Sequence, residues 1–397
     1  MSRGRAVPVG GRILTRPFMV MATVFALGMA VLAWRFLVGL GAPTAMNDGY
    51  PWGIWIAFDV VVGTAIACGG YAMAILVYVL NRGEYHPMVR SAIVTSALGY
   101  SLAGLAVVID LGRFWNVWKV PIYFWSWNGT SILLEVALCI MLYTLVGWLE
   151  LGPTVVAKFC DPDSERCRRI VARIQRPVEK AMPWLLALGI LLPTMHQSSL
   201  GSLMLLAGPK LHPLWSTPLL PLLFLVSCIA MGFGGVVIEA NLSAEAFGRP
   251  RHTRLLQGLA RPTAWVLLDF AAVRLADLAF RGRLGLIFGS GELSALFLAE
   301  MVLFVGTGLA LLTPRLTRDA GSLFRLAMLV ILAGGLYRFS TFLIAFDPGP
   351  QWSYFPSVPE LLVTLGLLAA EFMAYVVLVK TFPILQATPS APVSSHS

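Results

Sequence analysis

The first long apolar run, residues 17–40, reads PFMVMATVFALGMAVLAWRFLVGL and contains one charged residue, Arg35. An α-helix rises ~1.5 Å per residue, so about 20 such residues cross the hydrocarbon core of a bilayer. Four arginines precede the run, which is too long for the core of a signal peptide and has no small-residue cleavage pattern. It is predicted to be an uncleaved first membrane span.

Similar runs recur along nearly the whole chain, in which 58% of the residues are hydrophobic and 12% are charged. Soluble domains carry roughly 25% charged residues. Lipid leaves no backbone polar group unpaired, and these runs lack the alternation of a membrane β-barrel, so the spans are expected to be helices. The sequence predicts an all-α polytopic integral membrane protein with about ten bundled transmembrane helices. The expected spans are 17–40, 52–80, 88–111, 126–150, 182–206, 218–242, 263–280, 291–313, 322–346 and 358–384.

Lys and Arg are unevenly distributed over the segments between these spans. If the N-terminus is cytoplasmic, the inside segments hold 21 of the 29 and the outside loops hold five. The positive-inside rule then predicts that both termini are cytoplasmic, in a bacterial inner membrane. It also explains the net charge of +9 without nucleic acid as a partner. Three parts are expected: a cytoplasmic N-terminus at 1–16, the transmembrane domain at 17–384 and a disordered cytoplasmic tail at 385–397.

The expected loops differ in composition between the two sides. The outside loops at 41–51, 112–125, 207–217 and 347–357 are rich in Trp, Tyr, Pro and Gly. An aromatic belt at the membrane interface accounts for most of these rings, and a nearly uncharged aromatic face also suits docking of a partner protein. On the inside, the polar segment 152–181 is expected to form a short surface helix.

Ionisable residues within the spans are the first candidates for function, because charges in lipid are costly. Asp59 is expected about two helical turns below the outer surface. Asp110 is expected at the outer end of the third span, where Arg113 can pair with it three residues later. Glu135 is expected roughly 15 Å below the outer face. No cation lies near Glu135 in its own span, which favours a functional role.

The fifth span contains an unusually polar run at residues 192–202, LPTMHQSSLGS. Such a run in mid-membrane is tolerated where it faces protein or a water-filled cavity, so it predicts a pocket wall. His196 is expected near the middle of the membrane and suits proton transfer near neutral pH. Tyr100 is expected near mid-depth in the third span, and Glu239 near the inner end of the sixth.

The remaining buried charges are expected to fix helix packing through ion pairs or hydrogen bonds. These are Asp269, Arg274, Asp277, Glu300, Arg338 and Glu371.

The histidines and cysteines bear on cofactors. Only His196 of the five histidines lies inside an expected span, and the five cysteines form no C-x-x-C motif. A membrane b-type haem usually takes two axial histidines, and iron–sulfur clusters need cysteine sets, so the chain is expected to hold no haem, no iron–sulfur cluster and no other metal. Redox work would then use a diffusible quinone.

Several motifs together resemble one known family. The chain is similar to the membrane subunit of periplasm-facing nickel–iron uptake hydrogenases, within the NrfD/polysulfide reductase family of quinone-reactive membrane subunits. The resemblance runs from about residue 10 to 384. The matching stretches are 47–59 (NDGYPWGIWIAFD), 67–70 (ACGG), 81–87 (NRGEYHP), 99–102 (GYSL), 109–113 (IDLGR), the His196 run, 210–215 (KLHPLW) and 345–349 (AFDPG).

The resemblance implies a role as the non-haem quinone-binding subunit of a multisubunit oxidoreductase, with no action on hydrogen alone. A periplasmic iron–sulfur subunit, with the large and small subunits of a NiFe hydrogenase, would pass electrons to menaquinone or ubiquinone at the outer side. The implied quinone-binding residues are Asp59, Asp110, Arg113, Tyr100 and His196. The implied proton-transfer residues are Tyr100, Glu135, His196 and Glu239.

Two other functions remain open at this point. Intramembrane acids and glycine- or proline-interrupted helices are also typical of ion- or proton-coupled secondary transporters. A passive anchor for an enzyme is the third reading, and it needs neither Glu135 nor His196. The sequence leaves open which quinone is used, which catalytic partner binds, and whether turnover moves charge across the membrane.

Overall fold

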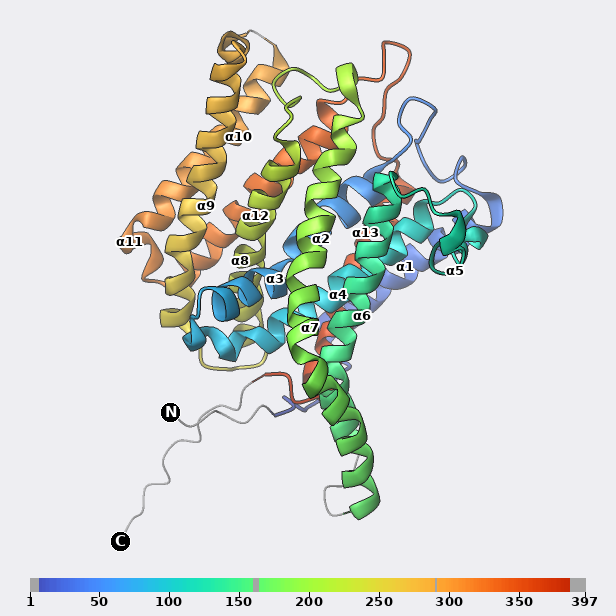
Figure 1. Cartoon of the computed structure of the whole chain (residues 1–397), viewed down its shortest axis with the longest axis vertical. Coiled ribbons are helices and arrows are strands. Elements are labelled where there is room, and N and C mark those ends of the chain that lie inside the picture. Colours follow the sequence, from blue (N-terminus) through green and yellow to red (C-terminus); the bar gives the residue numbers. More distant parts are fainter. Residues whose placement is uncertain (1–6, 160–163, 290, 386–397) are drawn as a thin grey trace.

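The protein is a bundle of long helices, seen in the computed structural model in Figure 1, which describes residues 7–159, 164–289 and 291–385. The principal elements are α1 (Arg16–Val38), η1 (Trp55–Val62), α2 (Gly63–Ile66), α3 (Gly69–Ala74), η2 (Ile75–Val79), α4 (His86–Asp110), α6 (Ile132–Phe159), α7 (Glu165–Leu205), α8 (Leu220–Ala246), α9 (Thr253–Phe280), α10 (Glu292–Leu312), α12 (Ala320–Phe339), η8 (Ser340–Ile344) and α13 (Val358–Thr381). Short elements in the connections are η3 (Gly83–Tyr85), η4 (Phe114–Asn116), α5 (Lys119–Ile122), η5 (Phe124–Ser126), η6 (Gly208–Lys210), η7 (Leu284–Phe288) and α11 (Pro314–Thr317).

The prediction of an all-α polytopic membrane protein is confirmed. Within the described ranges, nine helical segments are long and apolar enough to cross a membrane. The remaining expected span, 263–280, forms the second half of α9, which has 28 residues and packs along α8 and α10. This 18-residue span contains three charged residues, Asp269, Arg274 and Asp277, which is more than the nine other segments have over an equal length.

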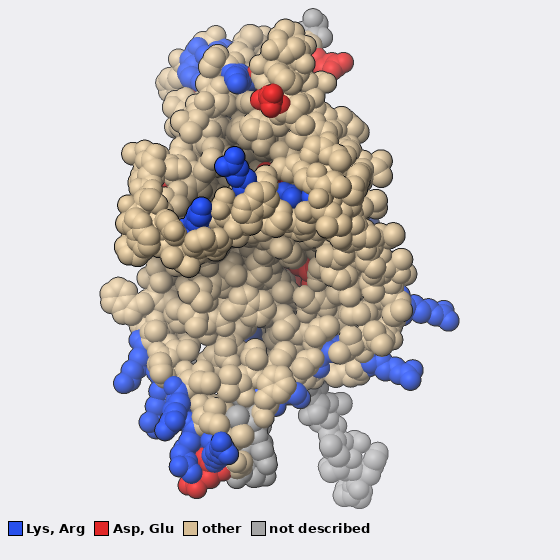
Figure 2. Space-filling view, turned by 90° about the vertical axis from the view of Figure 1, so that its right-hand side faces the viewer, with Lys and Arg blue, Asp and Glu red and all other residues tan. Residues whose placement is uncertain are grey.

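The bundle has two chemically different ends. We call the end with loops 39–54, 111–131, 206–219, 281–289 and 345–357 the aromatic end, and the opposite end the basic end. Trp115, Trp118 and Trp125 are exposed at the aromatic end. Lys and Arg gather around the lower end in Figure 2, which is the basic end.

Both described chain ends lie at the basic end, where the backbone N–H of Val7 donates to the carbonyl of Leu385 at 3.0 Å. This agrees with an even number of crossings. The cytoplasmic location of that end stays a prediction. The expected disordered tail lies outside the described residues from 386 onward, as do residues 1–6 of the expected N-terminal segment.

The second span is interrupted instead of forming one α-helix. It begins as the π-helix η1, continues through the short α2, breaks at Ala67 and Cys68, and resumes as α3 and η2. Small residues allow the break to lie at the centre of the bundle: a Cβ on Gly232 of α8 would lie 2.6 Å from the carbonyl oxygen of Cys68. Most of this span is buried, and π-helical turns occur frequently at functional sites.

The connection between the fourth and fifth spans differs from the expectation of a short surface helix at 152–181. Helix α6 continues to Phe159 and α7 begins at Glu165, so the segment forms the ends of two long paired helices that project from the basic end (Figure 1). Ser164 caps α7 by accepting a hydrogen bond from the backbone N–H of Cys167. The polar sequence after this cap is rich in Arg and Glu, which are good helix formers, so the helix starts well before its apolar part.

Candidate functional site

The break in the second span faces a group of buried polar side chains, which we call the central cluster: Thr64, Cys68, Tyr100, His196 and Gln197. His196 and Gln197 of α7 both contact the hydroxyl of Thr64, at 3.2 and 3.0 Å. The Tyr100 hydroxyl lies 3.5 Å from Cys68 Sγ, and its ring centroid lies 5.4 Å from that of His196. The structure thus brings together two of the predicted site residues, Tyr100 and His196, from different helices.

The central cluster has unused hydrogen-bonding capacity. His196 Nδ1 and Gln197 Oε1 are buried and have no hydrogen-bond partner within the described part of the chain. Buried polar atoms are nearly always paired, so such atoms mark a place where water or a ligand group can bind. His196 and Tyr100 each lie roughly 15 Å along their helices from the aromatic end, which is mid-membrane depth.

A buried cation lies beside this cluster. Arg338 of α12 donates to the carbonyl oxygens of Val61 and Phe224 at 2.9 and 2.6 Å, and to Ser227 Oγ at 3.1 Å. The predicted role of Arg338 in helix packing agrees with these contacts, which join η1, α8 and α12. No carboxylate forms an ion pair with it among the residues that the structure describes. Its positive charge is therefore held by carbonyl and hydroxyl oxygens within the described chain.

Asp59 lines a separate pocket, with a cavity volume of about 30 Å³, between η1, α4 and α13, which we call the Asp59 pocket. Its carboxylate accepts a hydrogen bond from Thr364 Oγ1 at 2.9 Å. Glu371 of α13, expected to fix packing through an ion pair or a hydrogen bond, lines the same pocket and makes no ion pair among the described residues. The other walls are mostly apolar, which gives an apolar space with two acidic groups.

The Asp59 pocket and the central cluster are back to back. Gly63 and Gly99 line the pocket, whereas their chain neighbours Thr64 and Tyr100 belong to the central cluster. At Gly99, an added Cβ would lie 2.5 Å from Ala67 Cβ, so this position needs glycine for the close approach of α4 to the break. The Asp59 pocket and the central cluster are therefore separated only by the backbone at residues 63–64 and 99–100.

Asp110 and Arg113 do not form the expected pair. Helix α4 ends at Asp110, Leu111 is extended, and Arg113 is exposed, so the i, i+3 helical spacing does not exist there. Instead Arg35 of α1 is buried and donates to the carbonyl oxygens of Ile109 and Leu111 at 2.7 and 2.6 Å. One oxygen of Asp110, Oδ1, is buried and has no hydrogen-bond partner among the described residues.

Beside Asp110, the Glu360 side chain joins loops of the aromatic end through hydrogen bonds. Its carboxylate accepts hydrogen bonds from the Tyr354 hydroxyl at 2.7 Å and from the backbone N–H groups of Ala45 and Ser357 at 2.9 and 2.8 Å. Burial, followed by the bond to Glu360, raises the pKa of Tyr354 well above its usual range, so this hydroxyl remains a donor. These bonds hold the loops at the aromatic end, on the side of the Asp59 pocket that faces this end.

Glu135 lies closer to the aromatic end than expected. The predicted span began at 126, but α6 begins at Ile132, because η5 and the turn at Asn128 and Gly129 occupy the preceding residues. Glu135 is therefore in the first turn, roughly 5 Å from the helix start instead of 15 Å. It is half-buried and does not belong to the central cluster.

Glu239 lies near the basic end of α8, as predicted. It accepts a hydrogen bond from the Tyr375 hydroxyl of α13. Tyr375 follows Glu371 by four residues, so the two side chains lie on one face of α13. Helix α13 thus presents the Asp59 pocket and the Glu239 contact on neighbouring turns.

Arg274 and Glu300, each expected to fix helix packing, form an ion pair with each other. Their nearest side-chain atoms lie 3.8 Å apart, with both side chains buried, and Trp215 Nε1 lies 3.2 Å from each carboxylate oxygen. Asp277 pairs with Arg281 on the same helix at 3.2 Å. Asp269 is exposed on α9 and makes no ion pair within the described chain.

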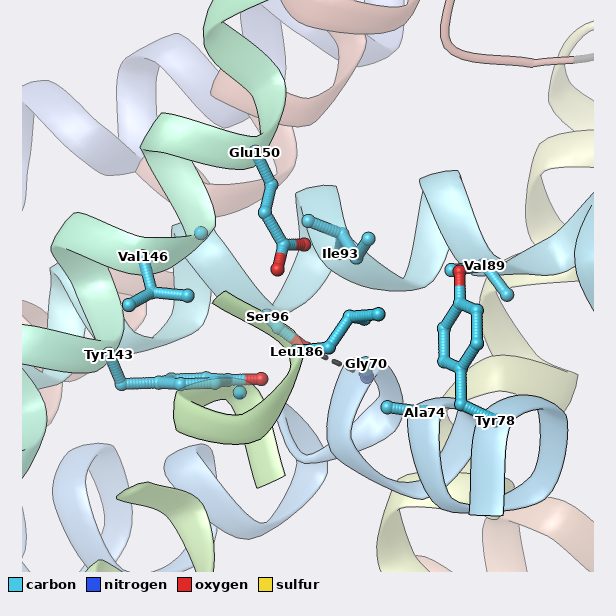
Figure 3. Close-up of a pocket in the computed structure, with 12 residues that line it drawn as sticks. Gly70, Ala74, Tyr78, Val89, Ile93, Ser96, Tyr143, Val146, Glu150 and Leu186 are labelled. Atoms are coloured by element: carbon cyan, nitrogen blue, oxygen red, sulfur yellow. Dashed lines mark hydrogen bonds between the residues drawn. The ribbon is translucent and has the colours of Figure 1, made fainter. Parts of the chain in front are cut away.

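Sequence reasoning missed three residues of this region. Arg35 was noticed only as a charge within the first span, Tyr143 was not considered, and Glu150 was assigned to the end of the fourth span. Tyr143 and Glu150 share a pocket with a cavity volume of about 30 Å³, shown in Figure 3, which we call the Glu150 pocket. Their spacing of seven residues, which places them on one face of α6, was the available signal.

Residues 42–345 match the family described as polysulphide reductase, NrfD. The chain belongs to this family. It is 40% identical, over 95% of its length and 94% of the relative's, to the probable Ni/Fe-hydrogenase 2 b-type cytochrome subunit of Escherichia coli K12. It is 29% identical to the integral membrane subunit of menaquinone reductase from Nitratidesulfovibrio vulgaris Hildenborough, over 55% of this chain and 51% of that one. The predicted resemblance is confirmed.

The expectation that the chain has no haem is contradicted by the name of the Escherichia coli relative, a b-type cytochrome subunit. The expectation considered only two histidines from one chain, whereas haem iron also takes Met, Cys or Tyr. The described histidines do not fit a bis-histidine site, because His196 is buried in mid-span, His212 is in a loop at the aromatic end, and His86 and His252 are exposed at the basic end.

Proposed function

We propose that this chain is the quinone-reactive membrane subunit of a respiratory oxidoreductase complex. The observation that carries this proposal is the Asp59 pocket, an apolar space with a carboxyl group that lies back to back with the buried central cluster. The names of the relatives support it, since one is a menaquinone reductase subunit and one a hydrogenase subunit. Menaquinone or ubiquinone is the proposed substrate.

The Asp59 pocket suits a quinone head group for chemical reasons. Its apolar walls, including Phe58, Leu102 and Leu367, can contact a ring, while the Asp59 carboxyl can exchange a proton with a quinone oxygen. Reduction follows the balance Q + 2 e⁻ + 2 H⁺ → QH₂, so the site must supply two protons. Asp110, Arg113, Tyr100 and His196 are the further residues that we assign to the quinone region.

Electrons are proposed to arrive at the aromatic end. Asp59 lies roughly 6 Å along its helix from Trp55 at that end, so a redox centre docked on the aromatic loops would be closer to the pocket than one at the basic end. The proposed donor is a periplasmic iron–sulfur subunit, accompanied by the large and small subunits of a NiFe hydrogenase. This orientation places both termini in the cytoplasm of a bacterium, with the chain in the inner membrane.

Protons are proposed to reach the pocket through titratable groups within the membrane-spanning helices. Tyr100 and His196 lie next to the Asp59 pocket, Glu239 lies near the basic end, and Glu135 lies near the aromatic end. A route from the basic end would move charge against the membrane potential, at ~2.3 kcal/mol per 100 mV for a complete crossing. Turnover would then be electrogenic.

A secondary transporter is the second candidate, and the interrupted second span favours it. Broken helices at mid-membrane form the substrate sites of many transporters. The two functions predict different behaviour of the isolated chain. A transporter would catalyse solute uptake alone in vesicles, whereas a quinone-reactive subunit requires an electron donor.

The test is gentle solubilisation of the tagged chain, identification of the proteins and metals that copurify, and assay of the assembly with a reduced dye and a short-chain menaquinone. We expect an iron–sulfur protein in stoichiometric amount and quinone reduction that a quinone-site inhibitor blocks. Copurification of no redox protein, together with solute uptake by the isolated chain, would refute the proposal.

A further inference from the structure

The Glu150 pocket lies on the basic-end side of the central cluster and is not accounted for by the functions above. Glu150 is seven residues beyond Tyr143 on α6, so it lies roughly 10 Å closer to the basic end. The lining comes from four parts of the bundle, the second span, α4, α6 and α7. In Figure 3 the Glu150 carboxylate points into the space that these helices enclose, toward the region of Ser96.

A series of ring contacts between side chains that carry polar groups links this pocket with the central cluster. The ring of Tyr143, which lines the Glu150 pocket, lies 4.4 Å from the ring of Tyr100, and Tyr100 lies 5.4 Å from the ring of His196. Ser96 lines the same pocket and donates to the carbonyl of Ala67 at the break in the second span. The pocket therefore reaches the central cluster through Tyr143 and along the break.

The Glu150 pocket is suited to water more than to a large apolar ligand. It is polar at Glu150, Ser96 and Tyr143, and its cavity volume of about 30 Å³ is enough for one or two waters, since each needs ~10–15 Å³ of such volume. At its basic-end side it is lined by Tyr78, which is 43% exposed. A carboxyl group, a hydroxyl group and water in contact form a chain that can move protons.

We propose that Glu150 and the water of its pocket form the proton entry from the basic end, with Tyr143 passing protons to Tyr100 and His196. The carboxylic acid of Glu150 releases one proton toward Tyr143, whose hydroxyl accepts it while passing on its own. Glu150 then regains one proton from the aqueous phase at the basic end. Two such cycles supply the two protons that a quinone takes up with two electrons. This inference rests on the proposed function.

The test uses the complete complex, purified through this chain and reconstituted into sealed vesicles, with reduced dye as electron donor and a short-chain menaquinone as acceptor. Glu150→Gln is expected to lower proton uptake from the basic-end side and quinone-coupled turnover by about tenfold or more. Glu150→Asp should restore part of both rates. Thermal stability and binding of a quinone-site inhibitor should match those of the wild type, which separates proton supply from folding and quinone binding.

Gly189 provides a second variant pair that leaves the carboxyl group intact. A Cβ on Gly189 would meet only Glu150 Oε1, at 4.0 Å, so a side chain can enter the pocket without a backbone collision. Gly189→Leu is expected to displace water and lower proton uptake as Glu150→Gln does, whereas Gly189→Ala should retain most of it. The control Glu179→Gln changes an exposed acid on the projecting part of α7 and should leave uptake unchanged.

The outcomes separate the two proposals. Wild-type rates in both Glu150→Gln and Gly189→Leu, in a complex that reduces quinone, would overturn the role of Glu150 and leave the proposed function intact. If the wild-type complex accepts electrons from the reduced dye but never reduces quinone, both the role of Glu150 and the proposed function are overturned.

Discussion

Gly28 of α1 and Gly366 of α13 touch at their backbones: a Cβ on Gly28 would lie 2.8 Å from the Cα of Gly366, and one on Gly366 would lie 2.9 Å from the Cα of Gly28. Small residues at such crossings let membrane helices approach closely. Most of α1 is otherwise little buried, so this crossing and the buried Arg35 are its main attachments to the bundle.

Gly28→Leu is expected to separate α1 from α13 and to lower the stability of the protein by about 1–3 kcal/mol, the usual cost of overpacking. The measurement is thermal unfolding in detergent. Gly41→Ala is the matched control, because nothing lies within 4 Å of the Cβ that it adds. Equal melting temperatures for the two variants would show that the crossing is not tight.

Removing one partner of the buried pair between Arg274 and Glu300 should be strongly destabilising. Glu300→Ala leaves the Arg274 charge buried and unpaired, for which about 3–5 kcal/mol is expected. The double variant Arg274→Met with Glu300→Leu should recover most of this loss, because it removes both charges. Glu165→Ala breaks an exposed pair with Arg169 and should change stability by at most about 1 kcal/mol. A double variant less stable than Glu300→Ala would contradict this account.

Asp59→Asn is expected to slow quinone reduction by about 10²-fold or more while the partner subunits still reduce an artificial dye. The amide keeps an acceptor for the Thr364 hydroxyl but cannot deliver a proton. Thr364→Val removes that hydroxyl and keeps the carboxyl group, so it should have a smaller effect. A parallel fall of dye and quinone activities would instead assign Asp59 to assembly.

Glu239 and Tyr375 test whether the basic end of α8 takes part in proton movement. Glu239→Gln should reduce charge movement during turnover in sealed vesicles, with dye activity preserved. Tyr375→Phe removes the hydroxyl that donates to Glu239 and should give a smaller reduction. The readout is the membrane potential built up per quinone reduced. Full charge movement in Glu239→Gln would restrict Glu239 to a packing role.

The orientation of the chain can be measured with single cysteines in an otherwise cysteine-free protein. Positions near residues 45, 119, 212, 286 and 351 should react with an impermeant maleimide added outside intact cells. A cysteine near residue 170, on the projecting part of α7, should react only after the cells are opened. Labelling at that position in intact cells would reverse the proposed topology and the direction of proton supply.

The sequence by itself determined the class of fold and most of the spans. Long apolar runs can be satisfied in lipid only as helices, so their number and approximate bounds follow from composition and length. The same local physics does not specify where a helix begins when turns precede it. For this reason the start of α6, and with it the depth of Glu135, was wrong, and the extension of α7 beyond the membrane was missed.

The candidate site depended on tertiary structure, because its members come from helices that are far apart in the sequence. Tyr100 and His196 were recognisable as unusual residues, but only packing brings their rings together at the break in the second span. Arg35 contacts the carbonyls on either side of Asp110 from 74 residues or more away, which replaces the local pairing with Arg113. Buried charges select partners by proximity in space, and that proximity is set by the packing of the helices.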